Sequence, residues 1–279
     1  MRKEISRFIE DGLCYGILGF MVIVVLLPIL WAFSTSLKPF DQTVAFPPKF
    51  IPETISFDSY VELLTKSSMP RFLLNSTIVS IGSVLLALFV GSHAGYAGAR
   101  LRFRGRNGFM LFILFAAMVP GISILIPLYG MMSRMKLLDS YFVLIITNGA
   151  QCIPMAVWLL RGFFQVIPQD LEESARIDGC STASAFYRIV LPLSAPGLVA
   201  AAIYTFIWTW NDFLFGFTLT SSDSKKVIQV GLYSFITGYG IEWNRLCASV
   251  ILGLIPVLVF FLLLERYFVQ GLTAGAVKG

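Results

Sequence analysis

The chain has 279 residues, of which 57% are hydrophobic and only 13% are charged, and its mean hydropathy is +0.79. A soluble domain has about 25% charged residues, so this composition excludes an ordinary soluble protein and indicates a membrane protein. The net charge of +5 does not indicate nucleic-acid binding, because the basic residues stand at the ends of apolar segments. The four cysteines include no C-x-x-C pair, and the single histidine, His93, cannot complete a zinc site.

Six segments are long and apolar enough to cross a bilayer, which takes about 20 residues in a helix. The first follows a basic start, as in a signal peptide, but its apolar run is too long and no small-residue cleavage site follows. We therefore expect it to be a retained helix. The sequence predicts an all-α, polytopic fold with six transmembrane helices, at residues 12–36, 72–99, 108–132, 142–166, 197–220 and 247–268.

Prolines and glycines mark special positions in the middle spans. Pro120 and Pro127 lie in the third span and Pro154 in the fourth. Membrane helices tolerate proline where neighbouring groups satisfy the freed backbone, so these residues indicate either kinks around a pathway or simple bends in packed helices. Gly91 and Gly95 have G-x-x-x-G spacing, which favours close packing against another helix, in this chain or in another.

Basic residues predict the orientation. The short loop after the second span reads "RLRFRGR", and arginine-rich short loops stay in the cytoplasm. Both termini should then be cytoplasmic. The expected organisation is a cytoplasmic segment with the first helix at 1–36, an extracytoplasmic loop at 37–71, a transmembrane domain with five helices at 72–268 and a cytoplasmic tail at 269–279. Shorter outer segments are expected at 134–140 and 221–244.

One polar segment, residues 168–196, interrupts the apolar sequence after the fourth span. "DLEESARID" predicts about two helical turns, with acids at the N-terminal end as the helix dipole favours. Gly179 should end this helix, Ser181 or Thr182 should cap a second one, and Pro192 should end that. The sequence predicts a helix-turn-helix hairpin on the cytoplasmic face. It is either an ordinary amphipathic loop or a docking surface for a soluble protein.

The hairpin resembles the EAA loop of permease subunits from bacterial ABC importers, whose pattern is E-A-A, three residues, G, nine residues and I-x-L-P. The matching residues are Glu173, Ala175, Gly179, Ile189, Leu191 and Pro192, and Ser174 replaces the middle alanine. The "RLRFRGR" loop, the "WND" of the fifth span and the tail "GLTAGAVKG" are similar to those of sugar permeases of the maltose-transporter type. The resemblance covers nearly the whole chain.

This resemblance implies the type I ABC importer permease fold in a bacterial or archaeal inner or plasma membrane. It also implies a second, different permease, two ATPase subunits carrying ATP and Mg²⁺, an extracytoplasmic solute-binding protein and surrounding membrane lipid. The hairpin would insert into a cleft on the ATPase. Glu173 would offer charge, Gly179 would allow the turn, Ala175 and Ile189 would pack, and Arg176 and Asp178 would make polar contacts at the rim. Leu191 and Pro192 complete the motif.

The chain itself has no G-x-x-x-x-G-K-[ST] phosphate loop. We expect it to hold no cofactor or metal, to bind no nucleic acid and to catalyse no reaction, so the energy should come from a partner. A membrane enzyme would need convergent acids, a nucleophile with a base, or a metal site, and the sequence offers none of these.

The fifth span ends in a polar stretch that is the predicted pathway site: Trp208, Trp210, Asn211 and Asp212. An acid at membrane depth is either functional or paired. These residues could therefore line a sugar pathway, or Asp212 could be part of a structural hydrogen-bonded group. The expected function is import of a sugar or oligosaccharide resembling maltose or trehalose. The alternatives are a glycerol-phosphate-type importer permease and an ion-coupled secondary transporter that uses Asp212.

Overall fold

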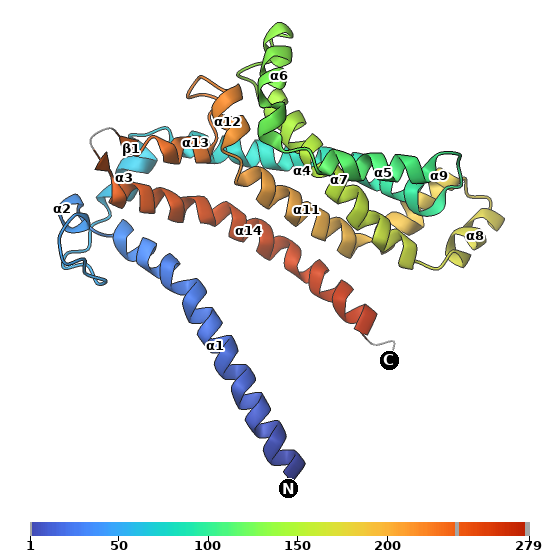
Figure 1. Ribbon diagram of the computed structural model, residues 1–279, viewed down its shortest axis with the longest axis horizontal. Helices are drawn as coiled ribbons and strands as arrows, with labels where there is room; N and C mark the ends of the chain where they lie inside the picture. The colour runs from blue at the N-terminus through green and yellow to red at the C-terminus, as the bar shows by residue number, and fades with distance from the viewer. Residues whose placement is uncertain (1, 238–239, 277–279) are drawn as a thin grey trace. The chain divides into compact units, whose positions relative to one another are not determined.

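The computed structural model describes residues 2–237 and 240–276, and these are almost entirely helical (Figure 1). The chain divides into two compact units. One unit comprises residues 1–69 and 232–254, and the other comprises residues 70–231 and 255–279. The all-α prediction is confirmed, apart from one very short antiparallel pair of strands.

The first unit consists of long and short helices joined by loops. Its elements are α1 (Arg2–Ser36), α2 (Phe40–Thr43), α3 (Asp58–Thr65), β1 (Ile236–Thr237), β2 (Gly240–Ile241) and the start of α14 (Trp243–Ala276). The side chains of α1 between residues 11 and 31 are apolar and exposed, which suits contact with lipid. Arg245 forms ion pairs with Glu62 and Glu242, so α3 is tied to the start of α14.

The second unit holds the remaining helices. They are α4 (Met69–Arg100), α5 (Arg106–Ala117), α6 (Gly121–Arg134), α7 (Tyr141–Val166), α8 (Asp170–Ile177), α9 (Thr182–Ala185), the π-helical segment η1 (Phe186–Val190), α10 (Leu191–Leu193), α11 (Ala195–Trp210), α12 (Leu214–Leu219) and α13 (Ile228–Tyr233), which runs into the first unit. Helix α7 packs against both α11 and α5.

Four of the predicted spans are single helices, and two are bent. The single helices long and apolar enough to cross a bilayer are Asp11–Ser36, Met69–Arg100, Tyr141–Val166 and Trp243–Tyr267. The bent pairs are 106–117 with 121–134, at 92°, and 182–193 with 195–210, at 75°. If each bent pair is one span, the described residues hold up to six.

Two of the predicted spans, 108–132 and 197–220, are not single continuous helices. The third span breaks just before Gly121, at Pro120, which lacks an N–H group and restricts the residue before it. Pro127 and Pro154 lie inside helices that continue past them. The fifth span stops at Trp210, and a separate short helix, α12, follows it.

Helices α4 and α7 approach closely where the G-x-x-x-G spacing predicted a small-residue contact. A Cβ atom on Gly91 would lie 2.8 Å from Cβ of Ala156, and one on Gly95 would lie 3.0 Å from the carbonyl oxygen of Val157. Only glycine leaves room for the backbones at this distance. The helix partner that the sequence left open is therefore α7 of the same chain.

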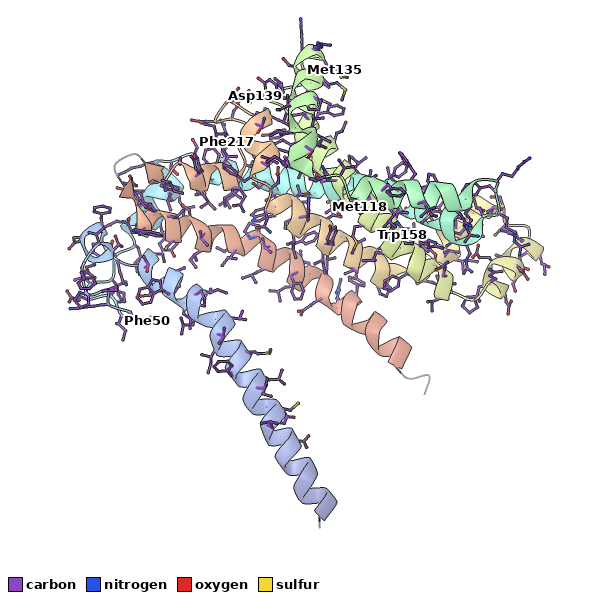
Figure 2. All side chains as sticks on the ribbon, viewed as in Figure 1. Phe50, Met118, Met135, Asp139, Trp158 and Phe217 are labelled. Atoms are coloured by element: carbon purple, nitrogen blue, oxygen red, sulfur yellow. The ribbon has the colours of Figure 1, made fainter. Side chains whose placement is uncertain are left out.

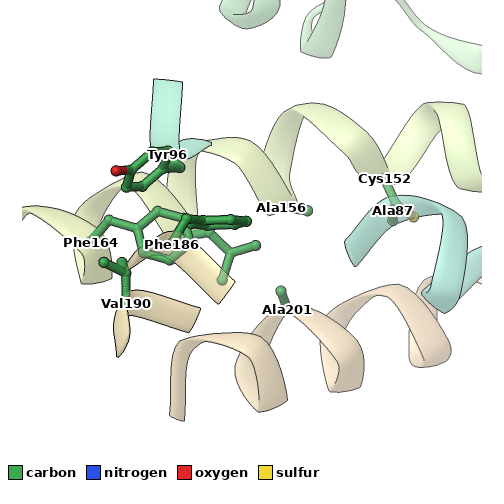
Figure 3. Close-up of a cluster of buried hydrophobic side chains, with 9 residues drawn as sticks. Ala87, Tyr96, Cys152, Ala156, Phe164, Phe186, Val190 and Ala201 are labelled. Carbon is green, nitrogen blue, oxygen red and sulfur yellow. The ribbon is translucent and has the colours of Figure 1, made fainter. Parts of the chain in front are cut away.

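Aromatic residues from three elements form a core beside this contact (Figure 3). Tyr96 comes from α4, Phe164 from α7 and Phe186 from η1, and all three are buried. The ring centroids of Tyr96 and Phe186 lie 4.6 Å apart. Tilted and edge-on aromatic pairs at such distances add to the energy of burial. This core places the polar segment 168–196 against α4 and α7.

Candidate functional site

The polar segment forms the predicted helix-turn-helix hairpin. Helix α8 carries three acids in its first turn, Asp170, Glu172 and Glu173. It ends before Gly179, which has a left-handed φ of +90° and open space where a Cβ would lie. The Ser181 hydroxyl then accepts a hydrogen bond from the Ser184 backbone N–H and caps α9. The turn needs glycine for its backbone conformation, not for a close contact.

The second limb of the hairpin continues past the expected end at Pro192. After α9, the π-helical turn η1 leads into the three-residue helix α10, and the chain bends at Ser194. π-Helical turns occur often at functional positions in longer helices. Ile189 and Leu191 are half-buried here, while Pro192 is exposed.

Most of the predicted coupling residues in the first limb are exposed. Glu173, Arg176, Asp178 and Gly179 all face outward, whereas Ala175 is buried. The sequence analysis missed Ile177, whose side chain is 87% exposed beside these charges. A large apolar side chain so exposed among polar residues is typical of a surface that contacts another protein. The sequence signal for this contact surface was a single isoleucine, Ile177, in an otherwise polar turn.

The opposite face of α8 carries a buried ion pair that the sequence analysis also missed. Glu172 is only 4% exposed. Its Oε1 lies 2.9 Å from Nε of Arg100 at the end of α4, and its Oε2 accepts a hydrogen bond of 2.7 Å from the Tyr96 hydroxyl. Arg100 also donates to the Ile167 carbonyl, just before the hairpin. The sequence did hold a signal that Glu172 is buried, because Glu172 and the apolar Ala175 are three residues apart and therefore share a helix face.

A second polar contact joins the other limb to α4. The Nδ1 atom of His93 lies 2.6 Å from the Phe89 carbonyl oxygen, and because a carbonyl only accepts, Nδ1 must donate. In the neutral ring Nε2 then accepts from the Tyr187 hydroxyl, at 2.6 Å. His93 therefore makes its hydrogen bonds within the helix bundle. His93, Tyr96 and Arg100 lie on one stripe of α4, at positions i, i+3 and i+7.

A cavity of about 970 Å³ lies where the third span bends. The break between α5 and α6 forms one wall, and α7 and the end of α11 form the others. Its lining is mostly apolar, with Gln151, Trp158, Tyr204, Trp208, Asn211 and Asp212 as the polar or amphipathic members. Figure 2 labels Met118 and Trp158, which line it from α5's end and α7. A cavity of this size holds a small ligand.

Three of the four predicted pathway residues, Trp208, Asn211 and Asp212, line the cavity, and Trp210 does not. Trp208 is 50% exposed, stacks on Tyr204 with ring centroids 6.0 Å apart, and lines the cavity together with Asn211. Trp210 is only 4% exposed and stacks on Phe206, away from the cavity lining.

Asp212 lies at the cavity wall, but its carboxylate oxygens already accept hydrogen bonds from other groups of the protein. Oδ1 accepts from the backbone N–H of Phe215, and Oδ2 accepts from that of Gly216 and from the Asn148 amide. These contacts satisfy the free N–H groups at the start of α12. The geometry is that of a helix cap.

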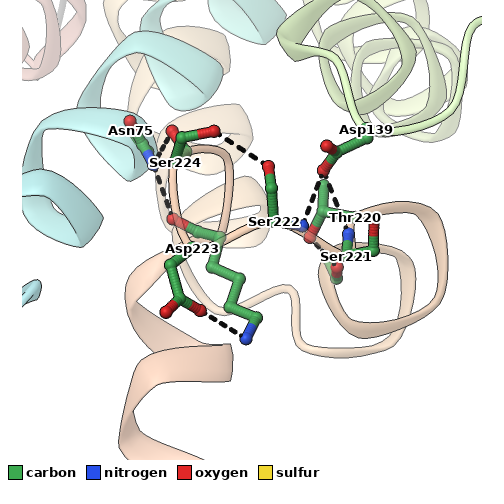
Figure 4. A network of polar contacts seen from close by, with 9 residues as sticks. Asn75, Asp139, Thr220, Ser221, Ser222, Asp223 and Ser224 are labelled. Atoms are coloured by element: carbon green, nitrogen blue, oxygen red, sulfur yellow. Dashed lines mark hydrogen bonds and ion pairs between the residues drawn. The ribbon is translucent and has the colours of Figure 1, made fainter.

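The loop that contains Asp139 and the loop of residues 220–226 meet near the N-terminal end of α4 (Figure 4). The Asp139 carboxylate accepts hydrogen bonds from the backbone N–H groups of Ser221 and Ser222, both at 3.0 Å. Partial burial raises the pKa of Asp139, but hydrogen bonds from the Ser222 side chain and from the two backbone N–H groups, together with the Lys225 charge, outweigh it and hold the pKa below its ordinary value. The buried amide of Asn75 donates to the Ser224 and Lys226 carbonyls, which fastens this loop to α4.

Metal-ligating residues do not gather in the part of the chain that the structure describes. Within residues 2–237 and 240–276, no three His, Cys, Asp or Glu side chains are grouped so as to hold an ion. The four cysteines are free thiols. The tail "GLTAGAVKG" spans residues 271–279. Helix α14 includes it up to Ala276, and its side chains lie outside the described ones.

Comparisons with known proteins match this arrangement to a transport family. Residues 83–273 match the model of the binding-protein-dependent transport system inner membrane component. The chain is 38% identical to a probable ABC transporter permease protein, y4oR, of Sinorhizobium fredii, with 92% of each chain covered. It is also 38% identical to the trehalose transport system permease protein SugB of Mycobacterium tuberculosis, covering 91% of this chain and 93% of that one.

A solved structure shares the fold. It is described as a bacterial ABC transporter involved in the import of the acidic polysaccharide alginate. One of its chains superposes with a TM-score of 0.80 at 24% identity, covering 94% of this chain and 98% of that one. The family match and the curated relatives together establish that this chain is a membrane-embedded ABC transporter permease of the binding-protein-dependent transport system inner membrane component family.

Proposed function

We propose that this permease imports a sugar or oligosaccharide and transmits to the membrane the work of ATP-hydrolysing partners. It would form half of the translocation pathway beside a second, different permease. Two ATPase subunits, which carry ATP and Mg²⁺, and an extracytoplasmic solute-binding protein complete the assembly. Both termini and the hairpin 168–196 would face the cytoplasm of a cell with this permease in its inner membrane.

The observation that carries the proposal is the exposed face of α8. Glu173, Arg176 and Asp178 present charges of both signs around the exposed Ile177. A small apolar centre with a charged rim is the common composition of a protein interface. In this proposal the face inserts into the ATPase cleft, while Gly179 forms the turn that the face requires.

A neutral sugar is the favoured cargo. Trp208 offers a half-exposed ring to the cavity, and Asn211 and Gln151 offer amides, which suits a ligand with hydroxyl groups and apolar ring faces. Among the described residues, no Arg or Lys lines this cavity, although a phosphorylated substrate would require one. The trehalose name of one relative supports the same choice.

The ion-coupled alternative depends on Asp212 as a carboxylate that binds and releases a proton or ion. Its oxygens already accept from two backbone N–H groups and one amide, so protonation would disrupt the cap of α12. This arrangement favours the structural role that the sequence left open.

The test is a pull-down of the tagged full-length chain from its own cells in mild detergent, followed by ATPase assay. We expect an ATPase and a second permease to co-purify, and expect Glu173→Ala or Gly179→Pro to release the ATPase. Asp223→Ala, which changes an exposed acid in the loop fastened by Asn75, is the matched control and should retain it. A chain that purifies alone and transports under an ion gradient would overturn the proposal.

Uptake then identifies the cargo. Cells that express the complex are given radiolabelled trehalose, maltose or glycerol 3-phosphate. We expect uptake of one of the two disaccharides. Uptake of glycerol 3-phosphate alone would favour the phosphorylated substrate instead.

A further inference from the structure

Two neighbouring glutamates in α8 have opposite surroundings. Glu173 points outward, whereas Glu172 is buried between Arg100 and Tyr96. A buried carboxylate is costly unless it is paired and hydrogen-bonded. Here Oε2 accepts a hydrogen bond from the Tyr96 hydroxyl, while Oε1 lies in ion-pair contact with Nε of Arg100 without hydrogen-bond geometry. The side chains of Arg100 and Glu172 are only 7% and 6% exposed, so water competes little for this contact.

Three side chains on the same stripe of α4 contact the hairpin. Arg100 contacts both Glu172 and the Ile167 carbonyl, Tyr96 contacts Glu172, and His93 contacts Tyr187 on the second limb. Both limbs are therefore attached to one helix. The contact at His93 is exposed, so the buried charges of Glu172 and Arg100 form the stronger attachment.

Helix α4 in turn packs against α7, which forms part of the cavity wall. Gly91 and Gly95 bring α4 against the Ala156–Val157 backbone of α7 with no space between them. Met155 and Trp158, which flank Ala156 and Val157 in the same turn of α7, line the cavity. A displacement of α4 toward α7 at this point must displace α7 as well, because close-packed interiors have low compressibility.

We infer that Glu172 is a positioning residue that joins the hairpin to α4 as one rigid body, so that movement of the hairpin moves α4 and, through it, the α7 wall of the cavity. The inference rests on the proposed function, in which a partner ATPase moves the hairpin. Glu172 has no contact with the ATPase in this scheme. Its role is to keep the moving surface attached to the membrane helix.

The test measures coupling in the assembled complex, reconstituted in nanodiscs for ATPase assay and in vesicles for uptake of the disaccharide identified above. In Glu172→Gln we expect the ATPase subunits to remain bound and to hydrolyse ATP. Uptake per ATP hydrolysed should fall by about tenfold or more, since a charge-assisted contact contributes at least that factor to an equilibrium. Tyr96→Phe keeps the ring packing, loses one hydrogen bond and should show a smaller decrease.

A distance measurement separates coupling from simple loss of fold. Nitroxide labels at Thr182 in the hairpin and Leu85 on α4, both exposed, are placed in a chain whose native cysteines are serines. In the otherwise unchanged chain, the distribution of distances between the two labels should be narrow. It should also have the same mean in the nucleotide-free state and in the state trapped with Mg²⁺, ATP and vanadate. In Glu172→Gln, this distance distribution should broaden or shift when the complex is trapped.

Two further variants keep the inference falsifiable. If Glu172→Gln does not accumulate, Arg100→Met with Glu172→Leu removes both charges together and leaves no unpaired buried ion. This double variant should assemble and still lose coupling. Unchanged uptake per ATP with an unchanged distance, in either variant, would overturn the inference.

The control Glu173→Gln distinguishes this inference from the proposed function. It should weaken ATPase binding and leave the distance between the labels unchanged. If Glu173→Gln and Gly179→Pro both retain the ATPase, the proposed function fails. If they release it while the Glu172 variants stay coupled, only the present inference fails.

Discussion

Helix α4 is held at its two ends by different kinds of polar contact. At its C-terminal end, Arg100 pairs with Glu172 of the hairpin, and both side chains are charged and buried. Near its start, the neutral amide of Asn75 binds two loop carbonyls and accepts from the Tyr141 hydroxyl. Both contacts join α4 to segments far away in the sequence.

This difference between a charged and a neutral contact determines which end of α4 tolerates substitution. A buried ion pair is strongly destabilised when one partner is removed, because the other is left as an uncompensated charge. A neutral hydrogen-bonding group leaves only unsatisfied dipoles. The hairpin end therefore depends on two residues being present together, whereas the loop end depends on many smaller contacts.

The largest effect is expected from Arg100→Met. It leaves the Glu172 carboxylate buried without its cation, which costs about 3–5 kcal/mol of unfolding free energy. Thermal unfolding of the purified chain in detergent measures the loss. The double variant with Glu172→Leu is the control and should recover most of it. Equal loss in the single and double variants would show that the ion pair is not the cause.

A smaller effect is expected at the opposite end from Asn75→Ala. It leaves the Ser224 and Lys226 carbonyls and the Tyr141 hydroxyl without their partner, at a cost of about 1–3 kcal/mol. The same unfolding assay applies. Ser80→Ala is the matched control, since Ser80 is buried on the same helix and its hydroxyl has no hydrogen-bond partner among the described residues. If both variants lose the same stability, the amide does not fasten the loop.

The smallest effect concerns pH at the loop end. The folded-state pKa of Asp139 is lower than its ordinary value of about 3.9, so its contribution to stability is present above that value and is lost as pH falls through the lower folded pKa. Asp139→Asn should therefore be less stable than the unchanged chain at pH 7, and the gap should close below about pH 4. A gap that is independent of pH would contradict the assignment.

The hairpin was the best-predicted part of the site. The acids at its start, the glycine turn and the serine cap are local features, and the structure has each of them. The third span was predicted less well, because a proline in an apolar run indicates either a bend or a break. At Pro120 the chain breaks, while at Pro127 and Pro154 it does not. The outcome depends on whether neighbouring groups satisfy the freed backbone.

The sequence by itself determined that this is a helical membrane protein with a polar hairpin, because apolar length, glycine conformation and helix capping act within a few residues. Only the tertiary structure decided that Glu172 turns inward while Glu173 turns outward, that α7 is the partner of the glycines in α4, and that the Asp212 carboxylate also binds Asn148 of α7. Each of these depends on a residue tens of positions away. Two adjacent glutamates are chemically identical until the fold supplies an arginine to one of them.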